Sequence, residues 1–189
     1  MLDRPLEPGM GILCHITSLP NGGRPGTMGK PARDFIDYLA AGGQRYWQIL
    51  PVNPCDHHGS PYAGLSAFAG NTALIEGTKE DIEKKTAAIK DSDPAFKAFC
   101  RKEEAWLLPY ATFRAIKHFE GERAWRTWPA KYKKYSDKLL HDPSLAKEIS
   151  YHEKRQFIFA QGWSELKEIA PSTGISHVGG KPMYVSADA

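Results

Sequence analysis

Two apolar segments decide the fold class of this chain: Gly11-Ile12-Leu13-Cys14-His15-Ile16 and Tyr46-Trp47-Gln48-Ile49-Leu50-Pro51-Val52. Both are short, and their composition predicts buried strands. Between them, Pro31 suits the first turn of a helix, while Gly42 and Gly43 supply its stop. The apolar face of this helix follows helical spacing: Ala32, Phe35, Ile36 and Leu39. A strand, a helix and a strand spaced this closely predict a βαβ unit with parallel strands.

The central part of the chain, residues 76–170, contains no convincing strand. Charges alternate in sign there, and aromatic residues recur at the spacing of helices over Ala105–Lys117 and Tyr151–Ala170. A proline inside a helix costs about 3 kcal/mol. We therefore expect the first of these helices to begin or bend at Pro109. Residues 175–186 are expected to form a third strand and the loop that follows it.

The predicted fold is α/β, divided into three parts. Residues 1–75 form a first βαβ unit, residues 76–150 a helical insertion, and residues 151–189 a helix with the third strand. The 189 residues carry a net charge of +3, which is too mild to indicate nucleic-acid binding. Three cysteines without regular spacing argue against a disulfide framework or a structural zinc site. No apolar stretch suggests a signal peptide or a membrane span, so we expect a soluble, cytoplasmic chain without membrane partners.

Two segments partly match familiar catalytic motifs, but each lacks a residue that the motif requires. Gly23, Gly26 and Gly29-Lys30 resemble a phosphate-binding loop, but the spacing is one residue too long and Pro31 replaces the hydroxyl residue. A flexible glycine turn is the simpler interpretation. His152-Glu153 begins a zinc-protease pattern, yet Gln156 stands where the second histidine is required. Neither a nucleotide nor a catalytic zinc ion is predicted.

Two polar clusters are interpreted as surface features. His57-His58 could bind a metal, but we expect neighbouring side chains to diverge and find no third ligand nearby, so loop histidines are favoured. The segment Lys131-Tyr132-Lys133-Lys134-Tyr135 interleaves charge and aromatic rings, as single-stranded nucleic-acid surfaces do. A solvated helix face with lysines extended over apolar surface is the favoured interpretation. The sequence thus predicts no metal and no nucleic acid.

The loop after the second strand carries the most informative residues. Pro61 forces Ser60 out of the helical region and fixes the presentation of Tyr62. An amphipathic ring held on a loop suits stacking on the apolar face of a sugar, while its hydroxyl bonds sugar oxygens. Aromatic loop residues are also commonly buried anchors, and the residues alone leave both interpretations open.

Several segments, in chain order, resemble one family, the amylomaltases, which are bacterial 4-α-glucanotransferases. Residues 11–20 are similar to the family's opening G-(I/L)-L-L-H-P-T-S-L-P, and residues 41–51 to A-G-x-x-x-W-Q-V-L-P. Residues 60–71 are similar to S-P-Y-Q-S-x-S-A-F-A-G-N. Further matches are Trp125, Trp128-Pro129, Gln156-Phe157, Trp163, Leu166-Lys167, Gly174-Ile175, Gly179, Pro182 and Tyr184-Val185-Ser186. The resemblance runs through nearly the whole chain.

This resemblance implies a (β/α)₈ barrel, of which the chain would hold the first three strands with a long helical insertion between strands 2 and 3. It implies transfer of α-1,4-glucan segments to a sugar 4-hydroxyl by a retaining double displacement, without cofactor or metal. The implied partners are α-1,4-glucans and maltooligosaccharides. The implied substrate-binding residues are Tyr62, Ser60 and Asn71.

The departures from the family pattern are equally specific. The family's nucleophile and general acid are expected beyond Ala189, so this chain is predicted to be catalytically incomplete. The family's G-D-S-P-Y reads His58-Gly59-Ser60-Pro61-Tyr62 here, so Gly59 stands where the family has its aspartate, and Lys181 replaces an apolar residue in the third-strand motif. Asp188 matches a family aspartate but is expected to lie at a frayed end. An unpaired strand edge should make the chain prone to association. A non-catalytic glucan-binding remnant and an inert fragment remain the alternatives.

Overall fold

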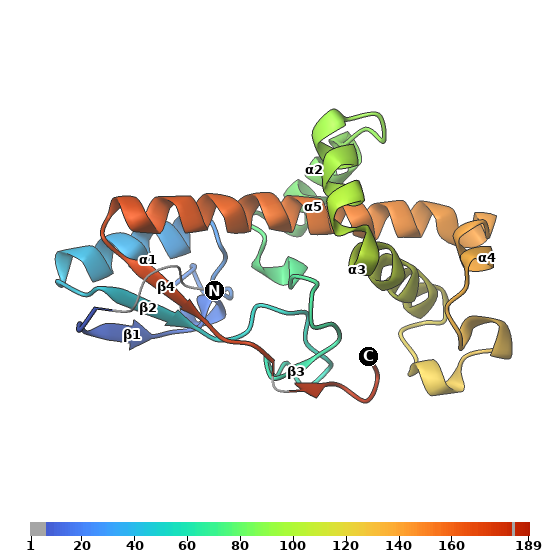
Figure 1. Cartoon of the computed structure of the whole chain (residues 1–189), viewed down its shortest axis with the longest axis horizontal. Coiled ribbons are helices and arrows are strands. Elements are labelled where there is room, and N and C mark those ends of the chain that lie inside the picture. The colour runs from blue at the N-terminus through green and yellow to red at the C-terminus, as the bar shows by residue number, and fades with distance from the viewer. Residues whose placement is uncertain (1–6, 183) are drawn as a thin grey trace.

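A parallel three-stranded sheet lies beneath two helices in this computed structural model (Figure 1). The structure describes residues 7–182 and 184–189. The strands are β1 (Gly11–Leu13), β2 (Tyr46–Ile49) and β4 (Ser176–Gly179), paired in the order β1-β2-β4. Helix α1 (Lys30–Ala41) connects β1 to β2. The α/β class, the βαβ unit and the third strand are therefore confirmed. The start of the predicted 1–75 unit and Met183 lie outside the described residues.

The remaining elements come mostly from the centre of the chain. They are β3 (Ala63–Gly64), α2 (Lys79–Ala88), α3 (Pro94–Phe119), α4 (Asp137–Leu140), α5 (Pro143–Ser172) and β5 (Tyr184–Val185), with 3₁₀ turns η1 to η4 at Ile16–Ser18, Thr72–Leu74, Trp125–Thr127 and Ala130–Tyr132. Within the described residues, 76–170 contain no strand, as predicted. None of the described helices combines the length and apolar character needed to cross a bilayer.

The first two strands are shorter than the sequence predicts. Strand β1 ends at Leu13, because Ile16 enters turn η1 and is fully buried there. Strand β2 ends at Ile49, two residues before Pro51, which has no amide hydrogen for a sheet. The predicted stop of α1 is confirmed, because the helix ends at Ala41, Gly42 caps it and Gly43 adopts the left-handed conformation, with φ +65°.

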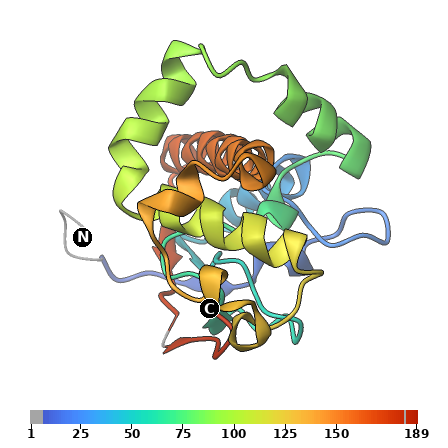
Figure 2. The same cartoon turned by 90° about the vertical axis from the view of Figure 1, so that its right-hand side faces the viewer.

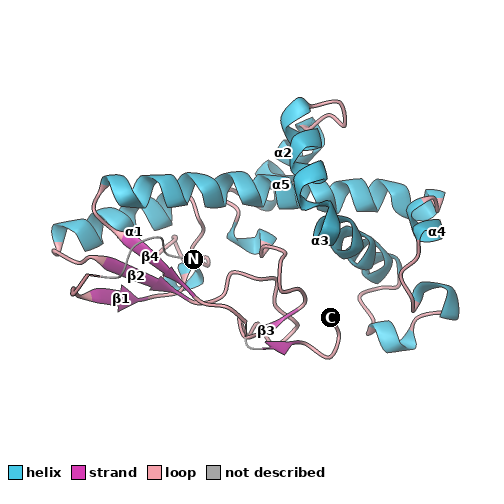
Figure 3. Ribbon diagram, in the orientation of Figure 1, coloured by secondary structure: helices cyan, strands magenta, loops and turns pink. Residues whose placement is uncertain are grey.

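The register of the sheet divides its side chains into two faces. Ile12, Trp47 and His177 align on one face, and Leu13, Gln48 and Val178 align on the other. Trp47 is fully buried in the core that the sheet forms with α1 and α5. Leu13, in contrast, is 57% exposed. Figure 3 shows the helices on one side of the sheet and no helix on the other.

The two long helices begin earlier than the sequence predicts because aspartates cap them. Asp93 Oδ1 accepts hydrogen bonds from the amides of Ala95 and Phe96, at 2.8 and 3.2 Å, ahead of α3. Asp142 does the same for Ser144 at 2.9 Å, ahead of α5. Helix α3 continues through Pro109 and changes direction part way along its length (Figure 2). The predicted bend is present, whereas a start at Pro109 is wrong.

The insertion has an apolar cluster of its own. It is formed by α3, turns η3 and η4, α4 and the beginning of α5: Ala111, Ala115, Ile116, Trp128, Tyr132, Leu139, Leu145 and Ile149. Tyr132 is buried in this cluster at a 3₁₀ turn, so the predicted α-helical face at residues 131–135 is wrong. The other four residues of this segment are exposed, as predicted, and Lys131 Nζ lies 4.3 Å from the centroid of the Tyr132 ring. Helix α5 runs through the 150/151 boundary, and the division into three parts stays a prediction.

Candidate functional site

The candidate site lies beyond the carboxyl ends of the three parallel strands. The loop of residues 50–71 follows β2 at that edge of the sheet. Within this loop, β3 pairs in parallel with β5, joining Ala63 to Tyr184 and Gly64 to Val185. Figure 1 shows this small pair beyond the tips of the main strands. Two distant parts of the chain therefore shape the loop. The sequence analysis did not predict this pairing of β3 with β5.

Two of the three predicted substrate-binding residues, Ser60 and Tyr62, lie at one turn. Ser60 Oγ accepts a hydrogen bond from the Tyr62 amide at 3.3 Å, and the Ser60 carbonyl accepts one from Ala63 at 3.1 Å. Both side chains are half-buried. Tyr62 is thus neither a fully buried anchor nor a fully exposed ring. Its backbone is held, while part of its side chain stays open to a ligand.

The third predicted residue, Asn71, shapes the other end of the loop. Its amide donates to the Val52 carbonyl at 2.7 Å. Its Oδ1 accepts a hydrogen bond from the Ala73 amide at 3.0 Å and caps turn η2. The hydrogen bonds therefore join Ser60 to Tyr62 but engage Asn71 in a separate cap. A role for Asn71 toward substrate stays a prediction.

Two buried amide side chains that the sequence analysis did not assign to the site hold the loop. Gln156 on α5 is only 2% exposed, and its Oε1 accepts from the Gly70 amide at 2.8 Å while its Nε2 donates to the Gly70 carbonyl at 2.9 Å. Asn53 Nδ2 donates to the Ser66 carbonyl at 2.8 Å. A Cβ on Gly70 would lie 2.1 Å from the Phe159 ring, so this close approach requires glycine. The sequence signal that could have identified Gln156 is a glutamine within an apolar helical stretch.

The end of the chain is anchored, which corrects the expectation that Asp188 lies at a frayed end. Asp188 Oδ2 accepts a hydrogen bond from Lys117 Nζ at 2.5 Å, and its Oδ1 accepts one from the Trp125 amide at 3.0 Å. The Lys117 side chain is only 6% exposed. A buried ammonium group requires a partner, and the insertion therefore binds the carboxyl-terminal segment through Asp188.

Two half-buried histidines of the sheet region have lowered pKa values. Burial lowers the pKa of His15, which follows β1, and its Nδ1 has no hydrogen-bond partner among the described residues. Burial, with a smaller contribution from the Lys167 charge, also lowers the pKa of His177. The His177 ring packs 5.2 Å from Trp47, between centroids. The His177 imidazole thus packs against a residue of the core.

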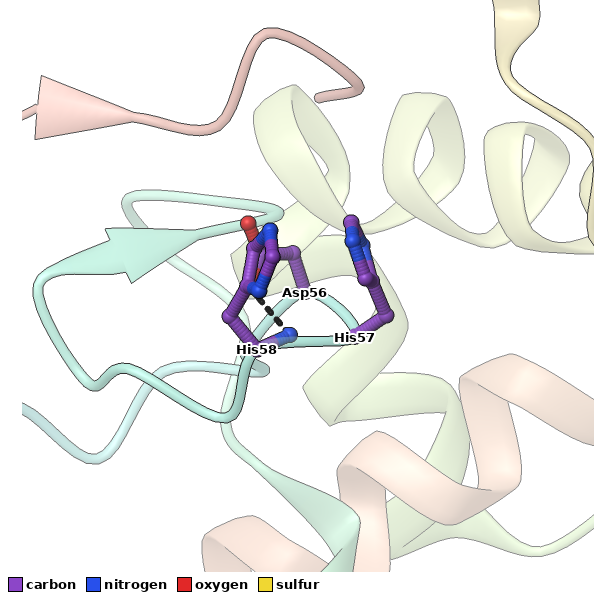
Figure 4. Close-up of side chains that lie close together, drawn as sticks. All are labelled: Asp56, His57 and His58. Atoms are coloured by element: carbon purple, nitrogen blue, oxygen red, sulfur yellow. Dashed lines mark hydrogen bonds between the residues drawn. The ribbon is translucent and has the colours of Figure 1, made fainter.

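Asp56, His57 and His58 form the one group with metal-ligand chemistry found in the described part of the chain. One ligand atom from each lies within 4.8 Å of the others. The two imidazole centroids are 3.8 Å apart (Figure 4). The expectations that these histidines diverge and that no third ligand is nearby are therefore wrong. The reason is the tight turn at Asp56–Gly59, which sequence spacing does not reveal.

Comparison with known proteins agrees with the motifs and the fold. A family model described as 4-alpha-glucanotransferase matches residues 14–92 and 76–189. The chain is 34% identical to a 4-alpha-glucanotransferase of Thermus thermophilus and 35% identical to one of Aquifex aeolicus, covering 95% and 93% of this chain but 43% of each relative. The chain thus spans less than half the length of these curated relatives.

Comparison with solved structures points to the same family. An amylomaltase from Streptococcus agalactiae, in complex with acarbose, superposes with a TM-score of 0.84 at 33% identity, over 95% of this chain and 44% of that one. An amylomaltase from Corynebacterium glutamicum, at 13% identity and a TM-score of 0.65, shares the fold. By sequence motif, family match and structure, the chain belongs to the 4-alpha-glucanotransferase family.

Proposed function

We propose that this chain forms the N-terminal part of a 4-alpha-glucanotransferase and that its 50–71 loop binds α-1,4-glucans. The observation that carries the proposal is the placement of Ser60 and Tyr62 at the carboxyl edge of a parallel sheet in a fold that matches an acarbose-bound amylomaltase. In this proposal the sheet is the first three strands of a (β/α)₈ barrel, whose sites lie at that edge. Tyr62 stacks on a glucose ring and its hydroxyl bonds sugar oxygens.

The proposed reaction is a retaining double displacement that needs two carboxyl groups about 5–5.5 Å apart, one as nucleophile and one as acid. Near the loop, Asp188 is ion-paired with the buried Lys117, so it is not a free partner carboxylate for Asp56. Asp34 and Glu76 pair with Lys30 and Arg33 instead. We therefore propose that the catalytic carboxylates lie beyond Ala189 and that these 189 residues alone bind glucan without transferring it.

Incubation of the purified chain with maltotriose tests catalytic incompleteness. We expect neither glucose nor longer glucans, because no nucleophile and acid pair is available. Products above those of a mock-purified control, abolished by replacing a carboxylate within residues 1–189, would overturn this part of the proposal.

Titration with maltooligosaccharides, followed by tryptophan fluorescence, tests binding. Tyr62→Ala should weaken binding by about 1–3 kcal/mol, the scale of one lost aromatic contact with its hydrogen bond. Tyr38→Ala, which removes an exposed tyrosine from α1, should leave the affinity unchanged. Equal losses in both variants, or no binding by the parent chain, would contradict the assignment of the loop as a glucan site.

A further inference from the structure

We propose that Asp56, His57 and His58 form a binding site for a divalent transition-metal ion, with zinc as the representative cation. Neither the glucan-binding proposal nor the transfer chemistry uses these side chains. The proposal rests on the convergence of two imidazoles and one carboxylate, which together supply three ligand atoms within 4.8 Å of one another.

A tight turn brings the three side chains together. The Gly59 amide donates to the Asp56 carbonyl at 3.0 Å, and Gly59 closes the turn with φ +70°. The His58 amide donates to Asp56 Oδ1, also at 3.0 Å. Figure 4 shows both imidazole rings and the Asp56 carboxylate on the same side of this turn. The backbone therefore presents the ligands together before any ion binds.

Distances and exposure allow the site to close on one ion. Zinc ligands stand about 2.0–2.2 Å from the metal, so the three atoms must come closer than their present spacing. His57 and His58 are exposed and can rotate inward without disturbing a core. Asp56 is half-buried, and its Oδ2 accepts a hydrogen bond from Ser186 Oγ at 3.3 Å. A carboxylate has about four lone-pair positions, which leaves capacity for a metal bond beside these hydrogen bonds.

The ligand set favours a transition metal over magnesium or calcium. Imidazole nitrogen suits zinc, copper and nickel, whereas magnesium and calcium select oxygen ligands. Three protein ligands leave at least one position for water or another ligand. The hydrogen bond between Asp56 and Ser186 links this site to the segment that follows β5, so an ion bound here would also strengthen the contact between the loop and that segment.

Calorimetric titration of the whole chain with zinc chloride, in a buffer that does not bind zinc, tests the proposal. We expect one ion per chain, reversed by a chelator. Replacing both His57 and His58 by alanine should weaken zinc affinity at least about tenfold, since even loss of an outer partner of a ligand costs that much. The matched control is His118→Ala with His141→Ala, two exposed histidines elsewhere, and it should bind as the parent does.

Two further measurements separate this site from adventitious binding. Cys55→Ser should keep the affinity, because its thiol contacts the Asn53 carbonyl at 3.6 Å and is not among the three ligands. In the unmodified chain, two of the seven histidine ring signals in the proton NMR spectrum should shift with substoichiometric zinc before the others. Absence of zinc uptake, equal loss in the control pair, loss with Cys55→Ser, or uniform shifts of all histidines would each overturn the proposal.

Discussion

At the scale of single residues, the loop depends on a few buried polar groups that connect distant parts of the chain. Gln156 pairs with both backbone polar groups of Gly70, and both residues are buried. Water cannot replace these bonds in a buried site, so their loss leaves two unsatisfied groups. The conformation of the loop end therefore depends on one side chain of α5, 86 residues later in the sequence.

Gln156→Leu should lower the free energy of unfolding by about 2–4 kcal/mol, because leucine has a similar size but cannot pair with the amide and carbonyl of Gly70. Urea denaturation followed by circular dichroism measures this change. Gln161→Leu, on an exposed position of the same helix, should change stability by less than about 0.5 kcal/mol. Similar effects for the two variants would show that the Gly70 contact does not stabilise the loop.

At the scale of elements, the packing of α3 against α5 buries ionisable groups. His152 on α5 has its pKa lowered to about 3, first by burial and then by the positive charges of Arg114, His118 and Arg155. Its Nε2 lies 3.4 Å from Glu148 Oε1, but a neutral imidazole makes this contact a polar one and not an ion pair. The interface between the two helices therefore requires the neutral form of the His152 imidazole.

This requirement predicts a pH dependence of stability. An unfolded histidine takes up a proton below about pH 6.5, whereas folded His152 does so only near pH 3. Between these values the unfolded state holds more protons, so the free energy of unfolding falls as the pH falls. His152→Gln should make this fall shallower between pH 6.5 and 4, while His141→Gln at an exposed position should not. Parallel stability curves for His152→Gln and the parent chain would contradict the prediction.

At the scale of the whole molecule, the sheet is covered on one face only. Among the described residues, β1 and β4 each pair with β2 alone, which leaves one edge of each strand unpaired. The face without helices carries Leu13, Gln48 and Val178 in register. Unpaired edges and apolar sheet faces promote association between chains. We therefore expect the predicted association between chains to occur at these unpaired edges and at this face of the sheet.

Leu13→Lys should reduce concentration-dependent self-association, measured by sedimentation velocity, because a charge then interrupts the apolar face beside the β1 edge. Phe68→Lys provides a control, since Phe68 is even more exposed, at 72%, but lies on the loop. We expect this second variant to associate as the parent does. A larger effect of Phe68→Lys would place the association on the loop.

The sequence by itself determined the elements that local patterns encode. Apolar runs and helical spacing predicted β1, α1, β2 and the parallel arrangement of their sheet. Motif order also identified the family, as the comparisons confirmed. Errors of boundary arose where a local interaction extended or ended an element, as with the Asp93 and Asp142 caps.

Only the tertiary structure decided how the candidate site is held. The β3–β5 pair, the contact of Gln156 with Gly70 and the bond from Lys117 to Asp188 each join segments far apart in the chain. No periodicity or spacing within one segment encodes such partners. Burial makes an unpaired polar group costly, and folding therefore selects partners by proximity in space, which is established only once α5 crosses both the sheet and the insertion.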